Sequence, residues 1–246
     1  MADWFETFFH GIGKKAVATS AHPEAARRAA MVKKLLRVRK GMRVLDVPCG
    51  AGRLTLPMAK MGVRMTGVDL CSGLIRKARR EAKKQDLDIR FMKRDMRAIE
   101  FDAEFDAVFN YGGSFGYFSD EDNLEVCKRM LKALKPGGRF LIEGLNKSWM
   151  LSHFKPVLET TMGPVKARVH NRFDPRTGRS HAKWILTDGK TEETRESHMW
   201  IFNGTEIRRL LRKAGFRKIT LHGWPPVGRL TRHSRRLMAV AARPKK

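Results

Sequence analysis

The sequence predicts an α/β fold: a Rossmann-like, seven-stranded, mostly parallel sheet with helices on both faces, plus a small antiparallel β insertion. From about residue 23 to 145, short apolar runs of strand length alternate with amphipathic segments of helical spacing, which is typical of a parallel sheet. After about residue 160, strand-like runs are separated by tight-turn signals, which indicates antiparallel strands. We therefore predict a single domain over residues 1–246 with an insertion at 160–202.

The parallel part is predicted from five strand-like runs and the three helical segments between them. The strands are expected at residues 44–47, 65–69, 89–92, 107–110 and 140–142. The helices are expected at residues 54–61, 72–84 and 121–134. The Lys-Pro-Gly-Gly stretch at 135–138 is expected to be a turn that ends the third helix and leads into the fifth strand.

The insertion and the C-terminal part follow from turn and capping signals. Strand-like runs at 165–173, 182–187 and 196–202 predict a three-stranded meander, because turn residues lie between them. Asn203 and Glu206 have the spacing of a capping box, so a helix is expected to run from there through Lys213. Two more strands are expected at 218–222 and 237–241.

The composition is ordinary except for its charge, which is +26 from 51 basic and 25 acidic residues. The excess is concentrated in residues 11–43 and 203–246. Such a field attracts nucleic acid, acidic membranes or an anionic small-molecule substrate. A solvated surface without a specific partner is favoured over these, because the excess is not confined to one short tail.

The hydropathy of the chain, its first residues and its cysteine content indicate its cellular location and whether it binds a metal. No apolar run of 18 residues exists, so no membrane span is expected. The first residues carry acids and do not look like a secretory signal. Three scattered cysteines predict neither disulfides nor a zinc site, so we expect a reduced, cytoplasmic protein with no metal.

The most informative stretch is the glycine-rich turn at residues 43–53, which follows the first strand. Gly50 and Gly52 let a backbone approach a ligand closely in front of a helix N-terminus, but dinucleotide-binding folds use the same device. Asp46 suits the cationic methionine end of S-adenosylmethionine (SAM) and would repel a pyrophosphate. Thr55 stands where a dinucleotide fingerprint needs its third glycine. These two residues favour SAM.

Later strand ends add further polar groups. Asp69 ends the second strand, where a carboxylate can accept both ribose hydroxyls; the alternative is that it caps the helix near Ser72. Asp95 ends the third strand and could accept from the adenine amino group while Met96 packs on the ring, although alone it would be a solvated turn residue. The glycine-rich and aromatic segment 105–118 would face the methyl group; the alternative is a buried aromatic turn.

These motifs, in this order, resemble the class I SAM-dependent methyltransferases over residues 30–145, and Ala214-Gly-Phe216 resembles the last helix–strand junction of that family. The N-terminal Asp3-Trp-Phe-Glu and the insertion are similar to small-molecule members, namely glycine N-methyltransferase-like and sugar N,N-dimethyltransferase enzymes. Pro48 departs from the family, because it replaces the first glycine of the loop and offers no N–H.

The resemblance implies SAM as the cofactor and transfer of a methyl group to an N or O atom of a small molecule by in-line displacement. It implies that SAM is lined by Asp46, Gly50, Gly52, Arg53, Asp69, Leu70, Asp95, Met96 and Asn110. The candidates nearest the methyl group are Tyr111, Tyr117 and the strand-end Glu143. His170, His181 and His198 lie on the insertion, and His198 is the histidine to test first, although packing is the commoner role of such residues.

Two segments are expected to cover the site. Residues 1–22 form a helical lid that carries Trp4, Phe5, Phe8 and Phe9, and residues 160–202 cover the substrate; simple packing of the lid helix is an equal alternative. The basic charge favours an alternative hypothesis, that the protein is an RNA or DNA methyltransferase. However, Asn110-Tyr-Gly-Gly lacks the Asn-Pro-Pro clamp of exocyclic-amine enzymes, and neither Cys49 nor Cys127 suits cytosine-C5 chemistry. Protein or lipid acceptors and a non-catalytic binding module are less favoured, and the oligomeric state stays open.

Overall fold

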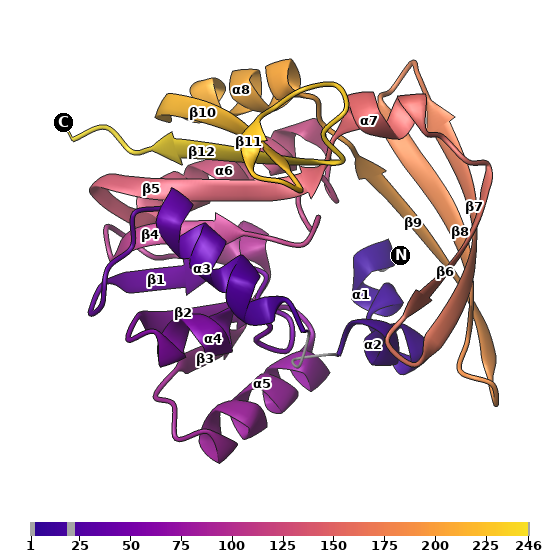
Figure 1. The fold of residues 1–246 in the computed structure, drawn as a ribbon, viewed down its shortest axis with the longest axis horizontal. Coiled ribbons are helices and arrows are strands. Elements are labelled where there is room, and N and C mark those ends of the chain that lie inside the picture. Colours follow the sequence, from indigo (N-terminus) through magenta and orange to yellow (C-terminus); the bar gives the residue numbers. More distant parts are fainter. Residues whose placement is uncertain (1–2, 19–22, 246) are drawn as a thin grey trace.

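The computed structural model describes residues 3–18 and 23–245 and has two β-sheets (Figure 1). The central sheet is mostly parallel, in the order β11-β10-β12-β5-β4-β1-β2-β3, with β12 antiparallel to both of its neighbours. Its strands are β1 (Arg43–Asp46), β2 (Arg64–Asp69), β3 (Arg90–Lys93), β4 (Phe105–Asn110), β5 (Leu134–Leu145), β10 (Arg217–Trp224), β11 (Gly228–Arg229) and β12 (Arg236–Ala242). The predicted α/β class is confirmed.

Helices cover both faces of this sheet. They are α3 (Ala25–Leu35), α4 (Thr55–Lys60), α5 (Ser72–Lys84), α6 (Asp120–Ala133) and α8 (Gly204–Lys213), with a short 3₁₀ turn η1 (Met96–Ala98). A further short helix, α7 (Lys147–Ser152), connects β5 to the second sheet. Strand alternation decides the faces: in β1, Val44 packs in one core with α3 and α4, whereas its neighbour Leu45 packs in the opposite core with α6 and α8. Both side chains are fully buried, so the sheet is apolar on both faces, as parallel sheets are.

Two details of the central sheet differ from the sequence prediction. The sheet has an eighth strand, the two-residue β11, which pairs with His222 and Gly223 of β10. In addition, β5 already begins at Leu134, so residues 135–138 belong to the strand and are not the expected turn. The glycines there still act locally, since Gly137 has a φ of +78° and the pairing with β4 is irregular between Phe105 and Ala107.

The second sheet is an antiparallel meander of four strands, β6 (Val157–Met162), β7 (Val165–Asp174), β8 (Arg179–Thr187) and β9 (Glu192–Trp200). Three strands were predicted here, the first at 165–173, and that number was wrong, because an additional strand, β6, precedes them. That strand escaped detection because most of its residues are exposed, which leaves no apolar alternation to read. Asn203 and Glu206 do form the predicted capping box, with Asn203 Oδ1 accepting from two backbone amides of α8.

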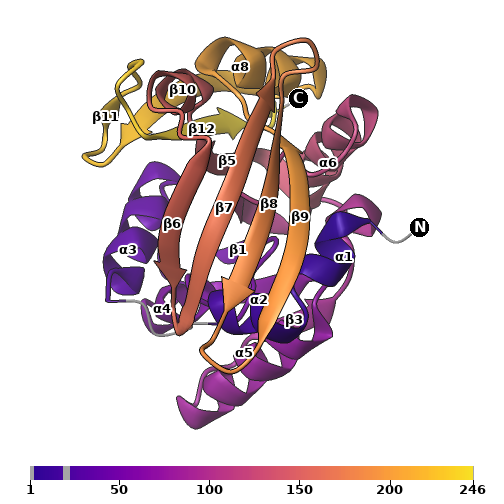
Figure 2. The ribbon, with the colours of Figure 1, turned by 90° about the vertical axis from the view of Figure 1, so that its right-hand side faces the viewer.

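The meander stands beside the central sheet, and the N-terminal helices lie between the two (Figures 1 and 2). These helices are α1 (Trp4–Phe8) and α2 (Gly11–Val17). Ile12 and Ala16 of α2 pack with Val165, Ala167 and Leu186 on the inner face of the meander. Of the predicted N-terminal segment 1–22, residues 1–2 and 19–22 lie outside the described part of the chain.

Candidate cofactor site

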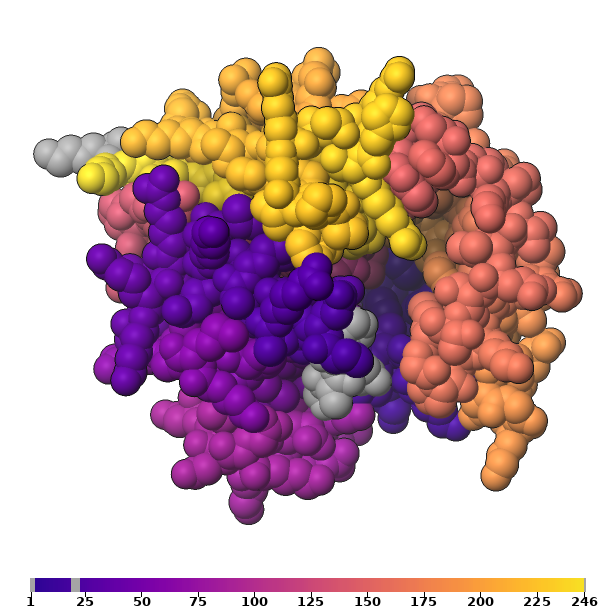
Figure 3. Space-filling view, viewed as in Figure 1, coloured from indigo at the N-terminus to yellow at the C-terminus, as the bar shows by residue number. Residues whose placement is uncertain are grey.

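A cavity of about 760 Å³ lies where β1, β2, β3 and β4 end, and the hollow is visible between the meander and the central domain in Figure 3. The strand-end loops form its floor, α1 and α2 form one side, and the meander adds Thr161–Gly163, Trp184, Ser197 and Met199. Ligands of open α/β sheets bind at the carboxyl ends of the strands. The volume is within the range of small-molecule pockets.

Asp69 organises the glycine-rich turn on the cavity floor. Its Oδ2 accepts from the Gly50 N–H and its Oδ1 accepts from the Cys71 N–H, each at 2.8 Å. The second bond reaches the N-cap of α5, so the capping alternative describes part of its role. Gly50 has a φ of +56°, and a Cβ added there would meet nothing within 4 Å, so the turn faces open space. Burial raises the pKa of Asp69.

Asp46 lies behind this turn, buried, with its carboxyl accepting from the Thr55 hydroxyl at 2.6 Å. Burial raises the pKa of Asp46 to about 8, mainly because an ionised carboxylate loses its hydration there. Thr55 therefore has a role beyond occupying the position of a third glycine. Its hydroxyl is the hydrogen-bond partner of Asp46, and the spacing of the loop residues alone did not predict this contact.

Neither Asp46 nor Asp69 forms an ion pair with a basic residue of the described chain. Two buried acids that form no ion pair within the described residues suit a ligand that brings its own positive charge and hydroxyl groups. Apolar and aromatic residues line the rest of the cavity, among them Leu70, Met96, Phe9 and Tyr117, and these suit a planar ring. The acidic, hydrogen-bond-accepting and apolar groups of the cavity therefore fit SAM.

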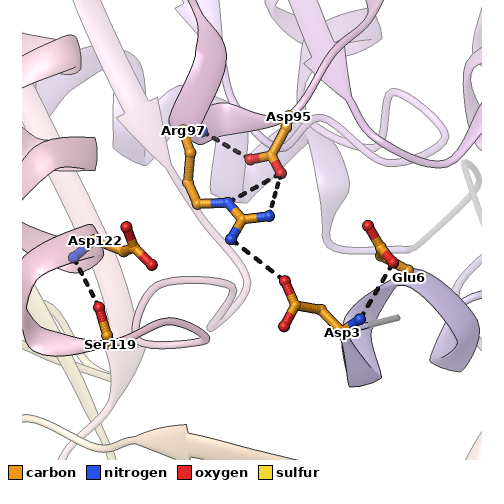
Figure 4. A network of polar contacts seen from close by, with 6 residues as sticks. All are labelled: Asp3, Glu6, Asp95, Arg97, Ser119 and Asp122. Atoms are coloured by element: carbon orange, nitrogen blue, oxygen red, sulfur yellow. Dashed lines mark hydrogen bonds and ion pairs between the residues drawn. The ribbon is translucent and has the colours of Figure 1, made fainter. Parts of the chain in front are cut away.

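Asp95 is held in a polar network that joins the third strand end to the N-terminal helix (Figure 4). Its carboxylate caps η1 by accepting from the Arg97 N–H and also binds the Arg97 guanidinium, at 2.7 and 3.0 Å. Arg97 in turn reaches Asp3 at 3.3 Å and lies over the rings of Phe5 and Phe118. Arg97 was missed from the sequence, because only the fold brings Asp3 next to it.

The structure divides the other predicted cofactor residues. The cavity is lined by Arg53, Leu70 and Met96. It is not lined by Asn110, which is fully buried, or by Gly52, which lies behind the loop. Asn110 points its amide at the Met96 sulfur, 3.9 Å away, and its Oδ1 has no hydrogen-bond partner within the described residues. Asn110 therefore contacts Met96, which lines the cavity, and does not line the cavity itself.

Of the proposed catalytic residues, Tyr111 and Tyr117 line the cavity, and burial raises the pKa of each to about 12. His198 does not line it. Ser197 and Met199 of β9 line the cavity, whereas His198 between them is exposed and its ring lies 5.9 Å from the ring of Trp4, which lines the cavity. The catalytic role of His198 stays a prediction.

Glu143 was expected near the methyl group, but the structure gives it another role. It is 2% exposed and forms a bidentate pair with Arg236, and it accepts from the Gly112 N–H at 2.8 Å. Glu143 is therefore an anchor of the glycine turn after β4 and does not line the cavity.

Comparison with known proteins agrees with this geometry. Residues 44–138 match the family model described as a methyltransferase domain. Its core is 32% identical over 124 residues to a ubiquinone biosynthesis O-methyltransferase of Coxiella burnetii, an alignment that covers 50% of each chain. The chain thus spans about half the length of the curated relatives it matches.

Solved structures share this fold over nearly the whole chain. A SAM-dependent methyltransferase of Clostridium acetobutylicum superposes with a TM-score of 0.77 at 17% identity, covering 98% of this chain and 99% of that one. SAM-bound CalS10, an amino pentose methyltransferase of Micromonospora echinaspora, superposes with a TM-score of 0.64 at 21% identity over 94% of both chains. At these identities the likeness shows the fold, including the meander.

Two further features were searched for in residues 3–18 and 23–245. No helix there combines the length and apolar character needed to cross a bilayer. No group of three His, Cys, Asp or Glu side chains there is placed to hold a metal ion.

Proposed function

We propose that this protein is a SAM-dependent methyltransferase that transfers a methyl group to an N or O atom of a small molecule by in-line displacement. The observation that carries the proposal is the covered cavity over Asp46 and Asp69. Helices α1 and α2 and the meander line its sides, which favours an acceptor of modest size over an extended polymer. In this reading residues 1–22 act as the lid and the meander as the substrate cover of a single domain.

When bound, SAM supplies a methyl group already activated by its sulfonium. Asp69 would accept from the ribose hydroxyls, Asp46 would face the methionine ammonium, and Met96 with Asp95 would hold the adenine. Tyr111 and Tyr117 keep their protons at neutral pH, since burial raises the pKa of each to about 12. They therefore position the acceptor by hydrogen bonds and do not act as bases, and alignment supplies most of the rate.

The pH dependence of cofactor binding tests the role of Asp46. A ligand ammonium favours the ionised carboxylate, whose pKa is about 8 without the ligand, so binding below pH 8 must release a proton. The affinity for S-adenosylhomocysteine should therefore rise with pH between 6 and 8, by up to about tenfold per unit. Calorimetry should find this slope reduced in Asp46→Asn; an equal slope in both proteins would refute the assignment.

The lid role of α1 is tested by Trp4→Ala. Trp4 lines the cavity and packs against Tyr117, with ring centroids 4.6 Å apart, as well as against Phe5 and Phe8. Its loss should speed dissociation of S-adenosylhomocysteine about tenfold in stopped-flow measurements, consistent with an aromatic contact worth about 1 kcal/mol plus the lost burial. Trp149→Ala, on α7 and stacked on His153 outside the cavity, is the matched control and should leave the rate unchanged.

The net charge of +26 keeps a nucleic-acid acceptor as the second candidate. Incubation with methyl-labelled SAM, a small-molecule fraction of a cell extract and purified RNA and DNA decides between the two. Label in the small-molecule fraction supports the proposal, and label in nucleic acid supports the rival.

The three cysteines are free and buried, which suits a reducing compartment such as the cytoplasm.

A further inference from the structure

The segment between β4 and α6 carries three of the side chains that line the cavity, those of Ser114, Tyr117 and Phe118. We call residues 114–118 the aromatic loop. Its Tyr117 also packs on α1, because its ring lies 4.6 Å from the ring of Trp4 and 6.1 Å from that of Phe5, measured between centroids. A displacement of the aromatic loop would therefore move Tyr117 relative to both the cavity and the N-terminal helix.

The meander holds the aromatic loop on either side of Tyr117. The Trp200 N–H donates to the Gly116 carbonyl at 2.7 Å. Both terminal nitrogens of the Arg179 guanidinium donate to the Phe118 carbonyl, each at 3.2 Å. Arg179 of β8 and Trp200 of β9 lie directly opposite each other in the antiparallel pairing. One cross-strand pair of the meander thus binds the residue before Tyr117 and the residue after it.

The backbone of the loop is shaped for these two contacts. Gly116 has a φ of +102°, and a Cβ added to it would overlap the Trp200 carbonyl oxygen, so the close approach of the loop to β9 requires glycine. The Phe118 carbonyl also accepts from the side-chain amide of Asn123 on α6, at 3.0 Å. This carbonyl therefore joins the central domain to the meander.

The Arg179–Trp200 pair is itself fixed to the central domain. The Trp200 ring contacts two cations, with the Arg179 guanidinium carbon 5.8 Å and the Lys147 Nζ 5.6 Å from its centroid. Lys147 is buried and forms an ion pair with Glu206 of α8. Arg179 also lies 3.8 Å from Asp120, but that carboxylate is largely exposed and adds little. The hydrogen bonds to the loop carbonyl are thus the main contact of Arg179.

We propose that Arg179 is a positioning residue that couples the meander to Tyr117. A charged guanidinium is a strong hydrogen-bond donor, and this one is 23% exposed, so water competes little for it. With Trp200 bound to Gly116, it sets where the Tyr117 side chain lies in the cavity. The proposal rests on the proposed methyltransferase function, in which Tyr117 positions the acceptor and the meander covers it.

Fluorine NMR measures the coupling, because the chain has two tyrosines, Tyr111 and Tyr117. Protein labelled with 3-fluorotyrosine gives one line for each, assigned with Tyr111→Phe and Tyr117→Phe. Arg179→Met removes the donors and keeps an unbranched side chain. It should shift or broaden the Tyr117 line and leave the Tyr111 line in place. Hydrogen exchange of the Trp200 amide should rise at least about 10-fold, since a charge-assisted hydrogen bond that holds its partner loop is lost.

Three variants make the NMR result decisive. Arg172→Met removes an exposed arginine from β7 and is the matched control, which should leave both lines unchanged. Arg179→Lys keeps a charged donor and should return the Tyr117 line part of the way. Gly116→Ala breaks the other contact of the pair and should move the Tyr117 line by itself. A Tyr117 line that is unchanged in both Arg179→Met and Gly116→Ala, or two tyrosine lines that move alike, would refute the coupling.

Activity and binding measured together separate positioning from cofactor recognition. Arg179→Met should lower the transfer of label from SAM to the small-molecule fraction at least about 10-fold, because small displacements of positioning groups have such effects. Its affinity for S-adenosylhomocysteine should stay within about threefold, because Asp46 and Asp69 lie on other strand ends. Equal losses of both would overturn the positioning role. A wild type that does not bind S-adenosylhomocysteine, or transfers no label, would instead contradict the proposed function, and the NMR result would still decide the coupling.

Discussion

Replacing Asp69 by alanine should weaken the binding of S-adenosylhomocysteine by at least about 100-fold. The change removes two proposed bonds from the ribose hydroxyls, each worth about 1.5–3 kcal/mol when the acceptor is ionised. It also releases the amides of Gly50 and Cys71, so the glycine turn loses the carboxylate that holds it. Isothermal titration calorimetry measures the loss directly.

Two further variants define what that result means. Asp69→Asn keeps one acceptor oxygen and should fall between alanine and wild type. Asp88→Ala removes an exposed acid just before β3 and should bind as wild type does, which controls for net charge. An Asp69→Ala protein that folds and binds within threefold of wild type would exclude Asp69 from cofactor recognition.

Replacing Arg236 by methionine should lower the free energy of unfolding by about 3–5 kcal/mol. Glu143 is 2% exposed, and without Arg236 its carboxylate keeps one backbone donor, the Gly112 N–H. The loss of the bidentate partner leaves a buried charge whose desolvation is offset by this one backbone N–H alone. Urea unfolding monitored by circular dichroism gives the value.

The double variant Glu143→Gln with Arg236→Met separates the unpaired charge from the lost packing. Because it removes both charges, it should be clearly more stable than Arg236→Met alone. If the single and double variants unfold at the same urea concentration, the pair is not the source of the destabilisation.

Features that depend on local chemistry were predictable from the sequence. The alternation of strand-like and helical runs predicted helices on both faces of the sheet, and the structure confirms it, with Val44 and Leu45 of β1 in opposite cores. The spacing of Asn203 and Glu206 predicted a capping box because both partners lie within one helical turn. The glycine turn was predictable for the same reason, since Gly50 has the left-handed conformation for which glycine is suited.

Features that depend on contacts between distant segments were not predictable. Asp3 meets Arg97 only because α1 folds over the end of β3. Glu143 was predicted to lie beside the methyl group because the sequence does not show its ion-pair partner, Arg236, which lies 93 residues away. Whether His198 or its neighbours line the cavity depended on the register of β9, where a shift of one residue exchanges the two faces of the strand.

A crystal structure of the protein with S-adenosylhomocysteine tests the central claim most directly. We predict the ligand in the 760 Å³ cavity, with its ribose hydroxyls within hydrogen-bond distance of Asp69 and its sulfur facing the space between Tyr117 and the meander. A ligand bound elsewhere, or a ribose whose hydroxyls do not contact Asp69, would contradict the claim.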